Sequence, residues 1–376
     1  IYWGDGSNTS LDVKILSRDA STAINNTISE MGDNSSSTWT KGVTHTYSSD
    51  GDYVVYWGSS ARESVENSNG SAWRNETKVN IGGPYDNNTS PVSAVPPVIQ
   101  VQDNTTFAYD VISSDTTGDN LTYRWGTRTE FFNSFTGGGI KSNLSGDYTM
   151  PTGMTLSSSG SITWDVRNSV LCDGCSSQDD VNDANDLWVA VIMVEDRFDN
   201  GSVKSYIPID FFFKTTAASN PPATLSGIPN ETQIVSVGNT KTFTITSTDD
   251  SGVAPTITVL NPPSDNSSIW STTSSTSGGE TTFTITFTPD SSMAGNTSVI
   301  SVRSTDNASM TKDQSFSIQV SSVSNADPTA PILLSPANGG NVTSPVTFRF
   351  AGSTDSDGDN VSYTMYICDN SGFVGC

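Results

Sequence analysis

Apolar and polar side chains alternate along much of this chain. The segments "KTFTIT" (241–246), "TTFTITFT" (281–288) and "SFSIQV" (315–320) carry an apolar residue at every second position. Because successive side chains of a β-strand point to opposite faces of a sheet, this period of two predicts strands with one buried and one solvated face. The longest apolar run, "WVAVIMV" (188–194), predicts a buried strand and is too short to span a membrane.

Composition supports the same interpretation. Of 376 residues, 108 are Ser or Thr, 31 are Gly and 17 are Pro. Threonine suits the pleat of a strand, whereas Gly, Asn and Asp suit tight turns. Together with the alternation, this profile favours folded β domains over disorder. Helical patterns are nearly absent, and residues 18–31 are left open between one short helix and a polar loop.

Polar, Pro-bearing stretches at 82–97, 214–223 and 321–331 interrupt the strand patterns and predict linkers. A chain of 376 residues is expected to form three or four domains of about 100 residues rather than one core. The expected domains span residues 1–95, 96–214, 215–322 and 323–376.

Two motifs in the first segment belong together. "WGDG" (3–6) and "THTYSSDGDYVV" (44–55) resemble the PKD (polycystic-kidney-disease) type of β-sandwich. Its repeats carry W-x-F-G-D-G followed by H-x-Y-x-x-x-G-x-Y-x-V. The matching positions here are Trp3, Gly4, Asp5 and Gly6 in the first motif and His45, Tyr47, Gly51, Tyr53 and Val55 in the second.

The PKD resemblance implies structural roles for these residues. Trp3 is expected in the core, Gly4 and Gly6 in a turn, and Asp5 pinning that turn through backbone hydrogen bonds. It also implies a sandwich that lacks its first strands.

The later segments resemble other surface modules. "FAYDVISSDTTGDNLTYRW" (107–125) and "MPTGMTLSSSGSITWDV" (150–166) are similar to cadherin-like or immunoglobulin-like modules of bacteria and archaea. The third segment is similar to the same group, and the fourth resembles the first half of a fibronectin type III-like domain. The fold class expected is therefore all-β, with three to four tandem immunoglobulin-like β-sandwich domains joined by short Pro-bearing linkers.

The chain is strongly acidic, with 40 Asp and Glu against 17 Lys and Arg and a formal net charge of −23. This balance argues against nucleic acid and anionic membranes as partners, and no membrane insertion is expected for this segment. It is compatible with cation binding, a saline environment or simple solubility.

Asn-X-Ser/Thr triplets are over-represented, since 17 of the 30 Asn residues begin one. The excess predicts N-linked glycans on an exported, extracellular or cell-surface chain of an archaeon or a bacterium, with a eukaryotic origin left open. The candidate acceptors are Asn8, Asn25, Asn34, Asn69, Asn75, Asn87, Asn88, Asn104, Asn120, Asn143, Asn200, Asn230, Asn266, Asn296, Asn307, Asn341 and Asn360.

The four cysteines form two close pairs, Cys172 with Cys175 and Cys368 with Cys376. In an exported chain we expect each pair to form a disulfide. "CDGC" (172–175) has no second half that would complete a zinc site, and no His follows it as a haem-attachment motif requires.

Catalytic patterns are weak, and we expect no enzyme. His45 is the only His, so any Ser-His or Cys-His mechanism would need it. The Asp residues are spread over repeated turns, and the sequence holds no Gly-rich phosphate loop, zinc motif or nucleophile elbow. Exposed Trp residues could form a carbohydrate platform, but core packing is favoured for each of Trp73, Trp125, Trp164, Trp188 and Trp270.

Calcium is the cofactor that the sequence favours. "DSDGDN" places Asp355, Asp357 and Asp359 at alternate positions around Gly358, so that several oxygens can point at one cation. The alternative is that Asp and Asn cap turns without metal. Weaker analogues contain Asp115, Asp119, Asp179, Asp180, Asp183, Asp186, Glu195, Asp196, Asp199, Asp249 and Asp250.

The leading hypothesis is a glycosylated, non-enzymatic structural subunit of an extracellular filament, surface layer (S-layer) or adhesive stalk that acts by self-assembly. The alternative is a glycan-binding adhesin or the accessory region of a larger secreted hydrolase. Expected partners are other copies of the chain and, in the alternative, cell-surface glycans.

The two ends of the sequence match incomplete modules. Either residues 1–376 are a window on a longer chain, or a neighbouring subunit supplies strands, because an unpaired sheet edge invites such pairing.

Overall fold

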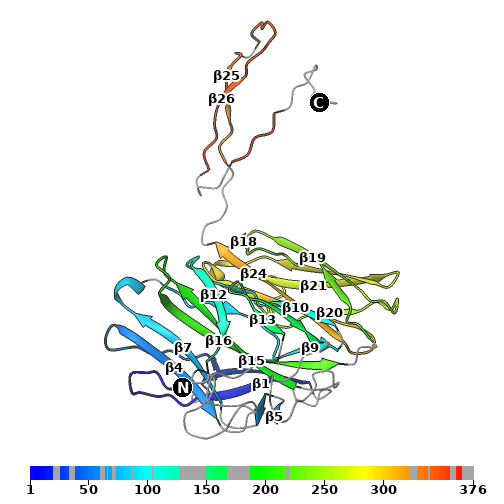
Figure 1. Cartoon of the computed structure of the whole chain (residues 1–376). Helices are drawn as coiled ribbons and strands as arrows, with labels where there is room; N and C mark the ends of the chain where they lie inside the picture. The colour runs from blue at the N-terminus through cyan, green and yellow to red at the C-terminus, as the bar shows by residue number, and fades with distance from the viewer. Residues whose placement is uncertain are drawn as a thin grey trace.

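Strands make up most of the regular structure in the computed structural model of this chain (Figure 1). The helices with described bounds are two 3-10 turns, η1 (Gly83–Tyr85) and η3 (Ser291–Met293). The all-β prediction is confirmed. The structure describes residues 1–19, 26–33, 39–59, 64–65, 67–69, 73–86, 88–103, 105–127, 130, 150–151, 153–166, 187–216, 220–321, 328–337, 339–355 and 361–365.

A six-stranded sheet forms the centre of the N-terminal half. Its order is β12 (Asn120–Trp125), β15 (Leu187–Arg197), β16 (Val203–Thr216), β7 (Trp73–Ile81) and β4 (Gly51–Ser59), and β9 (Val98–Gln102) pairs in parallel with the end of β16. The apolar run 188–194 lies in β15, and both of its faces are buried. Trp188, Ala190 and Ile192 enter one apolar cluster, whereas Val189, Val191 and Met193 enter another.

A second sheet closes the first sandwich over the inner face of β15 and β16. It contains β10 (Thr106–Asp110), β14 (Ser161–Asp165) and β13 (Met154–Leu156). Trp164 and Trp188, both fully buried, meet across the two sheets with ring centroids 6.4 Å apart and planes at 74°. Large aromatic side chains of this kind dominate the burial of a β-sandwich core.

The expected boundary near residue 95 does not separate sheets. β4 and β7 come from the first expected domain, yet they extend the sheet of the second. The junction of β7 with β16 has one backbone register pair, Lys78 opposite Tyr206. Side-chain donors reinforce it, since Thr77 Oγ1 bonds to the carbonyl of Tyr206 and Asn80 Nδ2 to that of Lys204. The first expected domain is therefore not a sandwich that stands apart.

Smaller sheets surround this sandwich. β1 (Asp12–Asp19), β2 (Asn26–Asp33) and β3 (Thr40–Lys41) form a meander, so residues 26–31 lie in a strand rather than in the helix or loop considered from sequence. The remaining short pairs are β5 (Ser64–Val65) with β6 (Ser68–Asn69), and β8 (Val92–Ser93) with β11 (Ser113–Ser114).

The second sandwich is built from residues 224–321. One sheet runs β17 (Thr224–Ser226), β19 (Lys241–Thr248), β22 (Glu280–Phe287) and β21 (Trp270–Ser277), and the other runs β18 (Gln233–Ser236), β24 (Thr311–Ser321), β23 (Thr297–Thr305) and β20 (Thr256–Val259). Buried positions alternate along β19 and β22 as the sequence predicts. Phe243, Ile285 and Phe316 are among the side chains that meet between the sheets.

Polar side chains of β23 and β24 pack against the first sandwich. The sequence predicts a solvated face for "SFSIQV" (315–320), but Ser315 and Ser317 are buried. Ser301 Oγ donates to the carbonyl of Ala94 at 2.6 Å, and Arg303 Nη2 donates to that of Val98 at 3.2 Å. Further bonds, such as Thr311 N to Gln100 Oε1 at 2.9 Å, lie along the same contact. The two sandwiches therefore pack as one body through a polar interface.

The last described segment is a separate hairpin of β25 (Ile332–Ser335) and β26 (Arg349–Ala351). It projects from the body in Figure 1.

The interface depends on Arg303, and its removal is a test of the packing. Arg303 binds Asp313 through Nε–Oδ1 at 2.8 Å and Nη2–Oδ2 at 2.9 Å, and the Asp313 side chain is only 1% exposed. Arg303→Ala leaves a buried carboxylate without its partner, so the free energy of unfolding should fall by about 3–5 kcal/mol in denaturant titrations. The exposed Arg349 of β26 is the matched control, because Arg349→Ala should change the free energy of unfolding by less than about 0.5 kcal/mol. Equal effects of the two variants would contradict the buried interface.

Candidate functional site

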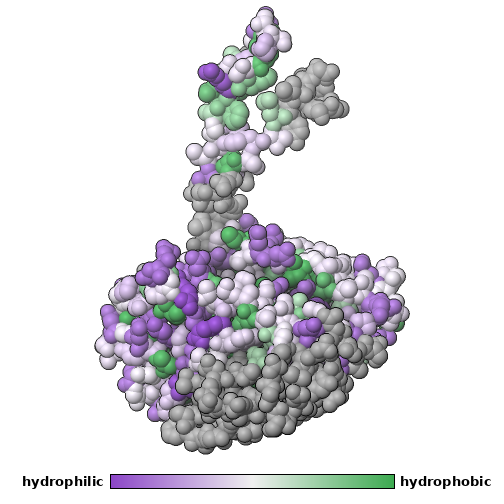
Figure 2. All heavy atoms as spheres, viewed as in Figure 1, coloured by the Kyte–Doolittle hydropathy of each residue, from purple (hydrophilic) through white to green (hydrophobic). Residues whose placement is uncertain are grey.

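The apolar hairpin, residues 328–365 as far as they are described, holds nine of the 16 exposed large apolar side chains among the described residues. Figure 2 shows apolar side chains gathered on this projecting segment. Nine large apolar side chains here are 38–65% exposed: Ile332, Leu333, Leu334, Val342, Val346, Phe348, Phe350, Tyr363 and Met365. Soluble monomers rarely expose apolar side chains in such a group, and such groups mark interaction sites.

Backbone geometry explains why this hairpin stays uncovered. Leu333 lies opposite Phe350 across the two strands, and consecutive side chains of a strand point to opposite faces. Ile332, Leu333 and Leu334 therefore expose apolar groups on both faces. The ring of Tyr363 lies 5.2 Å from that of Phe350, and its hydroxyl accepts a bond from Ser353 N at 2.6 Å. Among the described strands, none forms a second layer over this two-stranded sheet.

The PKD-like motifs meet at the N-terminus. The Trp3 ring stacks on His45 with centroids 4.6 Å apart, and the Tyr47 hydroxyl donates to the Trp3 carbonyl at 2.9 Å. Gly4 has φ +84°, and a side chain there would meet the carbonyl oxygen of Val54 at 2.7 Å. Trp3 is 9% exposed. The roles expected for Trp3 and Gly4 are confirmed.

Asp5 pins this turn as expected. Its Oδ1 accepts from Ser7 N at 2.9 Å and Ser7 Oγ at 2.6 Å, and its Oδ2 lies 2.8 Å from His45 Nε2. The Ser7 hydroxyl, the Ser7 amide and His45 lower the pKa of Asp5 to about 2. The contacts described for His45 therefore hold a turn together rather than activate a nucleophile.

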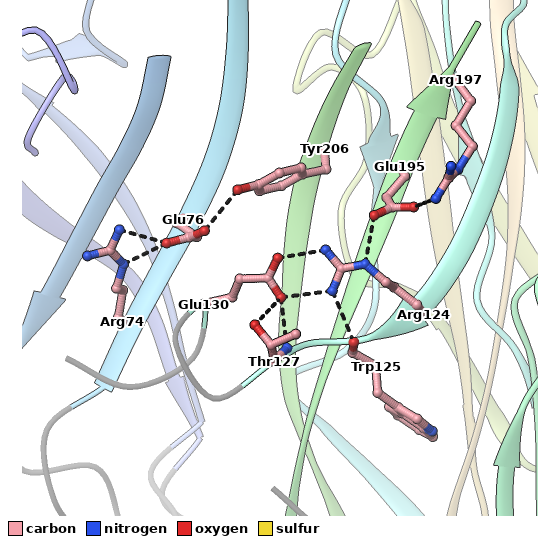
Figure 3. A network of polar contacts seen from close by, with 9 residues as sticks. All are labelled: Arg74, Glu76, Arg124, Trp125, Thr127, Glu130, Glu195, Arg197 and Tyr206. Atoms are coloured by element: carbon pink, nitrogen blue, oxygen red, sulfur yellow. Dashed lines mark hydrogen bonds and ion pairs between the residues drawn. The ribbon is translucent and has the colours of Figure 1, made fainter. Parts of the chain in front are cut away.

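A polar network lies on the outer face of the six-stranded sheet (Figure 3). Arg124 binds Glu130 through Nη1 at 2.8 Å and Nη2 at 2.6 Å, and its Nε donates to Glu195 at 2.7 Å. Glu195 also pairs with Arg197. Each carboxylate is held by a guanidinium, which ties β12 to β15.

The same network continues to β7. The Tyr206 hydroxyl donates to Glu76 at 2.8 Å, and Glu76 pairs with Arg74 at 2.6 Å. Burial, with the hydrogen bond to Glu76, raises the pKa of the Tyr206 hydroxyl. These contacts stabilise the junction of β7 and β16.

A cleft of about 740 Å³ lies between the two sandwiches. Ser159 and Ser161 line it from the first sandwich, and Asn230 and Gln314 from the second. Lys312 also lines it, and burial lowers the pKa of that ammonium group. The wall is mainly polar, so it suits a hydroxyl-rich ligand better than an apolar one.

The residues predicted for calcium and disulfides fall largely outside the described part. Asp355 is described and half-buried, whereas Asp357 and Asp359 lie outside the described residues. The calcium site there stays a prediction. Cys172, Cys175, Cys368 and Cys376 also lie outside them, so both disulfides stay predictions.

Most of the predicted glycan acceptors with described side chains lie at the surface, and their use stays a prediction. Exposed acceptors are Asn8, Asn120, Asn200, Asn230, Asn266, Asn296, Asn307 and Asn341, and half-buried ones are Asn75 and Asn88. Asn69 lies in β6, and the others, Asn25, Asn34, Asn87, Asn104, Asn143 and Asn360, lie outside the described residues. Asn88 Nδ2 donates to Asp196 Oδ2 at 2.8 Å, which engages the nitrogen that a glycan would occupy.

Four of the tryptophans considered for a carbohydrate platform pack in the cores as expected: Trp164, Trp188 and Trp270 are buried, and the half-buried Trp125 packs against the first core. The half-buried Trp73 instead meets the ring of Trp57. Outside the apolar hairpin, the exposed aromatics among the described residues are Tyr2 at 51% and Trp57 at 37%, which line a small groove beside β4. Sequence reasoning missed both, because alternation does not show which face of an edge strand such as β4 stays exposed.

The chain has no match among protein-family models or curated proteins. Solved structures that match parts of this chain include the Dpr2 Ig1-Ig2 complex with DIP-Theta (8% identity, 61% of this chain and 64% of that chain, TM-score 0.23). A second is the sialic acid binding region of a Streptococcus sanguinis adhesin, with 12% identity over 65% of this chain and 81% of that chain and a TM-score of 0.23. A third is the titin Ig tandem A164-A165, with 11% identity over 61% of this chain and 96% of that chain and a TM-score of 0.20. This chain spans less than two thirds of the Dpr2 complex chain. Likenesses of this size carry no argument about this chain.

None of the helices in the described residues is long and apolar enough to cross a membrane.

Asp5 gives the N-terminal turn a defined pH dependence. Because the pKa of Asp5 falls from 3.8 to about 2 on folding, its stabilisation is fully present above pH 3.8 and is lost as the pH falls through about 2. Asp5→Asn keeps an acceptor but removes the charge. We expect this variant to unfold at a lower denaturant concentration than the parent at pH 7, and the difference between their unfolding midpoints to disappear between pH 4 and pH 2. A difference in midpoint that does not change with pH would show that the charge of Asp5 does not stabilise the turn.

Proposed function

We propose that this chain is a non-enzymatic, extracellular structural subunit that associates with copies of itself through the apolar hairpin. The single observation that carries this proposal is the exposure of nine large apolar side chains on β25, β26 and the neighbouring residues. Covering such a surface removes apolar area from water, which is the main driving force for protein association. A filament, surface layer or adhesive stalk is the assembly that this surface serves.

The outer edges of β25 and β26 indicate how two copies would pair. β25 and β26 pair only with each other among the described strands, so each has an outer edge of backbone groups. Such edges accept a further strand, and antiparallel pairing of one edge with its own copy is self-complementary. The hairpin can therefore bind a second copy by strand addition together with side-chain burial.

The distribution of charge favours a second copy of the chain as the partner that covers the hairpin. The whole chain has a net charge of −23, so most contacts between two copies would bring like charges together. Residues 328–365 contain Arg349, Asp355, Asp357 and Asp359 as charged groups, a formal net charge of −2. The hairpin therefore carries only a small part of the negative charge of the chain, so two copies repel each other less here than elsewhere.

The body suits a structural role. Its two sandwiches are joined by hydrogen bonds from β23 and β24, which support a fixed relative orientation. Acidic groups and the predicted glycans on exposed Asn residues would keep its flanks soluble. Calcium at Asp355, Asp357 and Asp359 would then order the base of the hairpin.

Glycan binding by an adhesin, or by the accessory region of a larger secreted hydrolase, is the second candidate. The cleft of about 740 Å³ between the sandwiches favours it, because the wall offers hydroxyl and amide groups that match the polar edges of a sugar.

Leu333→Asp/Phe350→Asp tests self-association. The two residues are 54% and 47% exposed and face each other across the hairpin, so the change should not disturb the body. We expect the parent chain to associate with rising concentration in sedimentation velocity, and the double variant to associate at least about a hundredfold more weakly. Each apolar side chain contributes about 1.5–3 kcal/mol on burial.

Ile234→Asp is the matched control. Ile234 is 66% exposed on β18 of the second sandwich and is not part of the hairpin, so this variant should associate like the parent. A parent chain that stays monomeric up to its solubility limit would contradict the proposal, as would a double variant that associates normally. Monomers that bind to a glycan array would favour the second candidate instead.

A further inference from the structure

The small groove beside β4, called here the Tyr2 groove, contains an aromatic ring that is only partly covered. Its volume is about 350 Å³, and its lining includes Tyr2, Asn8 and Ser10. The Tyr2 ring stacks on the Tyr56 ring of β4 with centroids 4.9 Å apart and planes at 12°. Tyr2 nevertheless stays 51% exposed. Its ring therefore presents apolar surface that no described part of the chain covers.

An asparagine that begins a glycosylation triplet lies next to this ring. Tyr2 forms isolated antiparallel bridges with both Tyr56 and Asn8. Residues paired in this way have side chains on the same face, with Cβ atoms about 4.5–5.5 Å apart. Asn8 begins the triplet Asn-Thr-Ser at residues 8–10, and it is exposed. Its side-chain amide makes no hydrogen bond to a described residue, so Nδ2 is free to carry a sugar at the groove.

Hydrogen bonds hold Asn8 in this position. Trp3 N donates to the Ser7 carbonyl at 3.1 Å, and the Trp3 indole donates to Thr9 Oγ1 at 2.8 Å. The residues on both sides of Asn8 are thus tied to the segment that carries Tyr2. A sugar on Asn8 would start beside the ring instead of extending freely into solvent.

We propose that the first sugar of an N-linked glycan on Asn8 stacks on the exposed ring of Tyr2 and covers the Tyr2 groove. The C–H groups of a sugar ring pack well on an aromatic face, because the π-electrons give that face a partial negative charge. The sugar hydroxyl groups would meet water and the polar part of the wall, which includes Ser10. This inference rests on the predicted glycosylation of Asn8, goes beyond the proposed function and does not depend on self-association.

Attachment of the glycan is a group transfer for which this chain supplies only the acceptor. Asn8 Nδ2 loses a proton to solvent and forms a bond to C1 of the first sugar. The bond from C1 to a phosphate oxygen of a lipid-linked sugar pyrophosphate breaks, and the lipid pyrophosphate leaves as an anion. A separate enzyme of the export pathway would catalyse this transfer.

The stacked sugar would stabilise the bridge between the N-terminal turn and β4. Tyr2 N donates to the Tyr56 carbonyl at 2.9 Å, and Tyr56 N donates to the Tyr2 carbonyl at 3.0 Å. A sugar that packs on Tyr2 removes apolar area from water only while this bridge is closed. Local opening of the bridge, and with it hydrogen exchange of these two amides, should therefore become rarer.

Hydrogen exchange of the full chain tests this inference. The chain is secreted from yeast and trimmed with an endoglycosidase, which leaves one N-acetylglucosamine at each occupied site. Peptide mass spectrometry first measures the occupancy of Asn8. We expect exchange of the Tyr56 amide to be at least about threefold slower in the parent than in Ser10→Ala. That variant removes the triplet but keeps the Asn8 side chain.

Variants of Tyr2 separate stacking from other effects of the sugar. Tyr2→Ala should abolish the difference in exchange between chains with and without the triplet, whereas Tyr2→Phe should keep it, because the ring face remains. Tyr2 is 51% exposed, so both variants are expected to fold. Thr343→Ala is the matched control. It removes the exposed triplet that begins at Asn341 in the apolar hairpin, and it should leave exchange at Tyr56 unchanged.

Three results would overturn the proposal. The first is an Asn8 that carries no sugar, and the second is a sugar on Asn8 that does not slow exchange at Tyr56. The third is a slowing that persists in Tyr2→Ala, because the sugar would then act through another contact. None of these results bears on association through the hairpin, which sedimentation velocity measures separately.

Discussion

The packing of the two sandwiches depends on hydrogen-bond partners for polar side chains, because some of their strands are covered on both faces. A lone β-sandwich turns its outer faces to water, but here β15 and β24 are covered on both faces. Each buried polar group then needs a protein partner, because an unpaired one costs more than a typical hydrogen bond stabilises. Arg303 meets Asp313 and the Val98 carbonyl between the sandwiches, and Arg124 meets Glu130 and Glu195 on the six-stranded sheet. Guanidinium groups suit these positions, since their donors are fixed in a planar fork.

The apolar hairpin is the place where we locate function. Nine of its large apolar side chains are exposed, whereas apolar side chains of the two sandwiches fill their cores. In the proposed function a second copy of the chain covers this surface.

Sequence alone predicts the strands well, because alternation in "KTFTIT" or "TTFTITFT" reports directly on which side chains are buried. It also predicts the turn of Trp3 and Asp5, whose contacts are local to two short motifs. It does not show where a second face is buried: Ser315 looks solvated until β24 packs on the first sandwich and its hydroxyl meets the Ala94 carbonyl. The sequence pattern of β7 also does not show that its edge pairs with β16 across the expected boundary near residue 95. The sequence places Asp119 and Asp196 in two separate turns, and it does not show that long-range pairing brings both to Lys204.

The central claim is that copies of this chain meet through the apolar hairpin while the two sandwiches stay one unit. Electron microscopy of the associated full chain tests it most directly. Our account predicts that neighbouring bodies have the same internal arrangement and are joined at β25 and β26, with the six-stranded sheet and the β17–β19–β22–β21 sheet left free. Assemblies joined through either of those sheets, with the hairpin exposed to solvent, would contradict it.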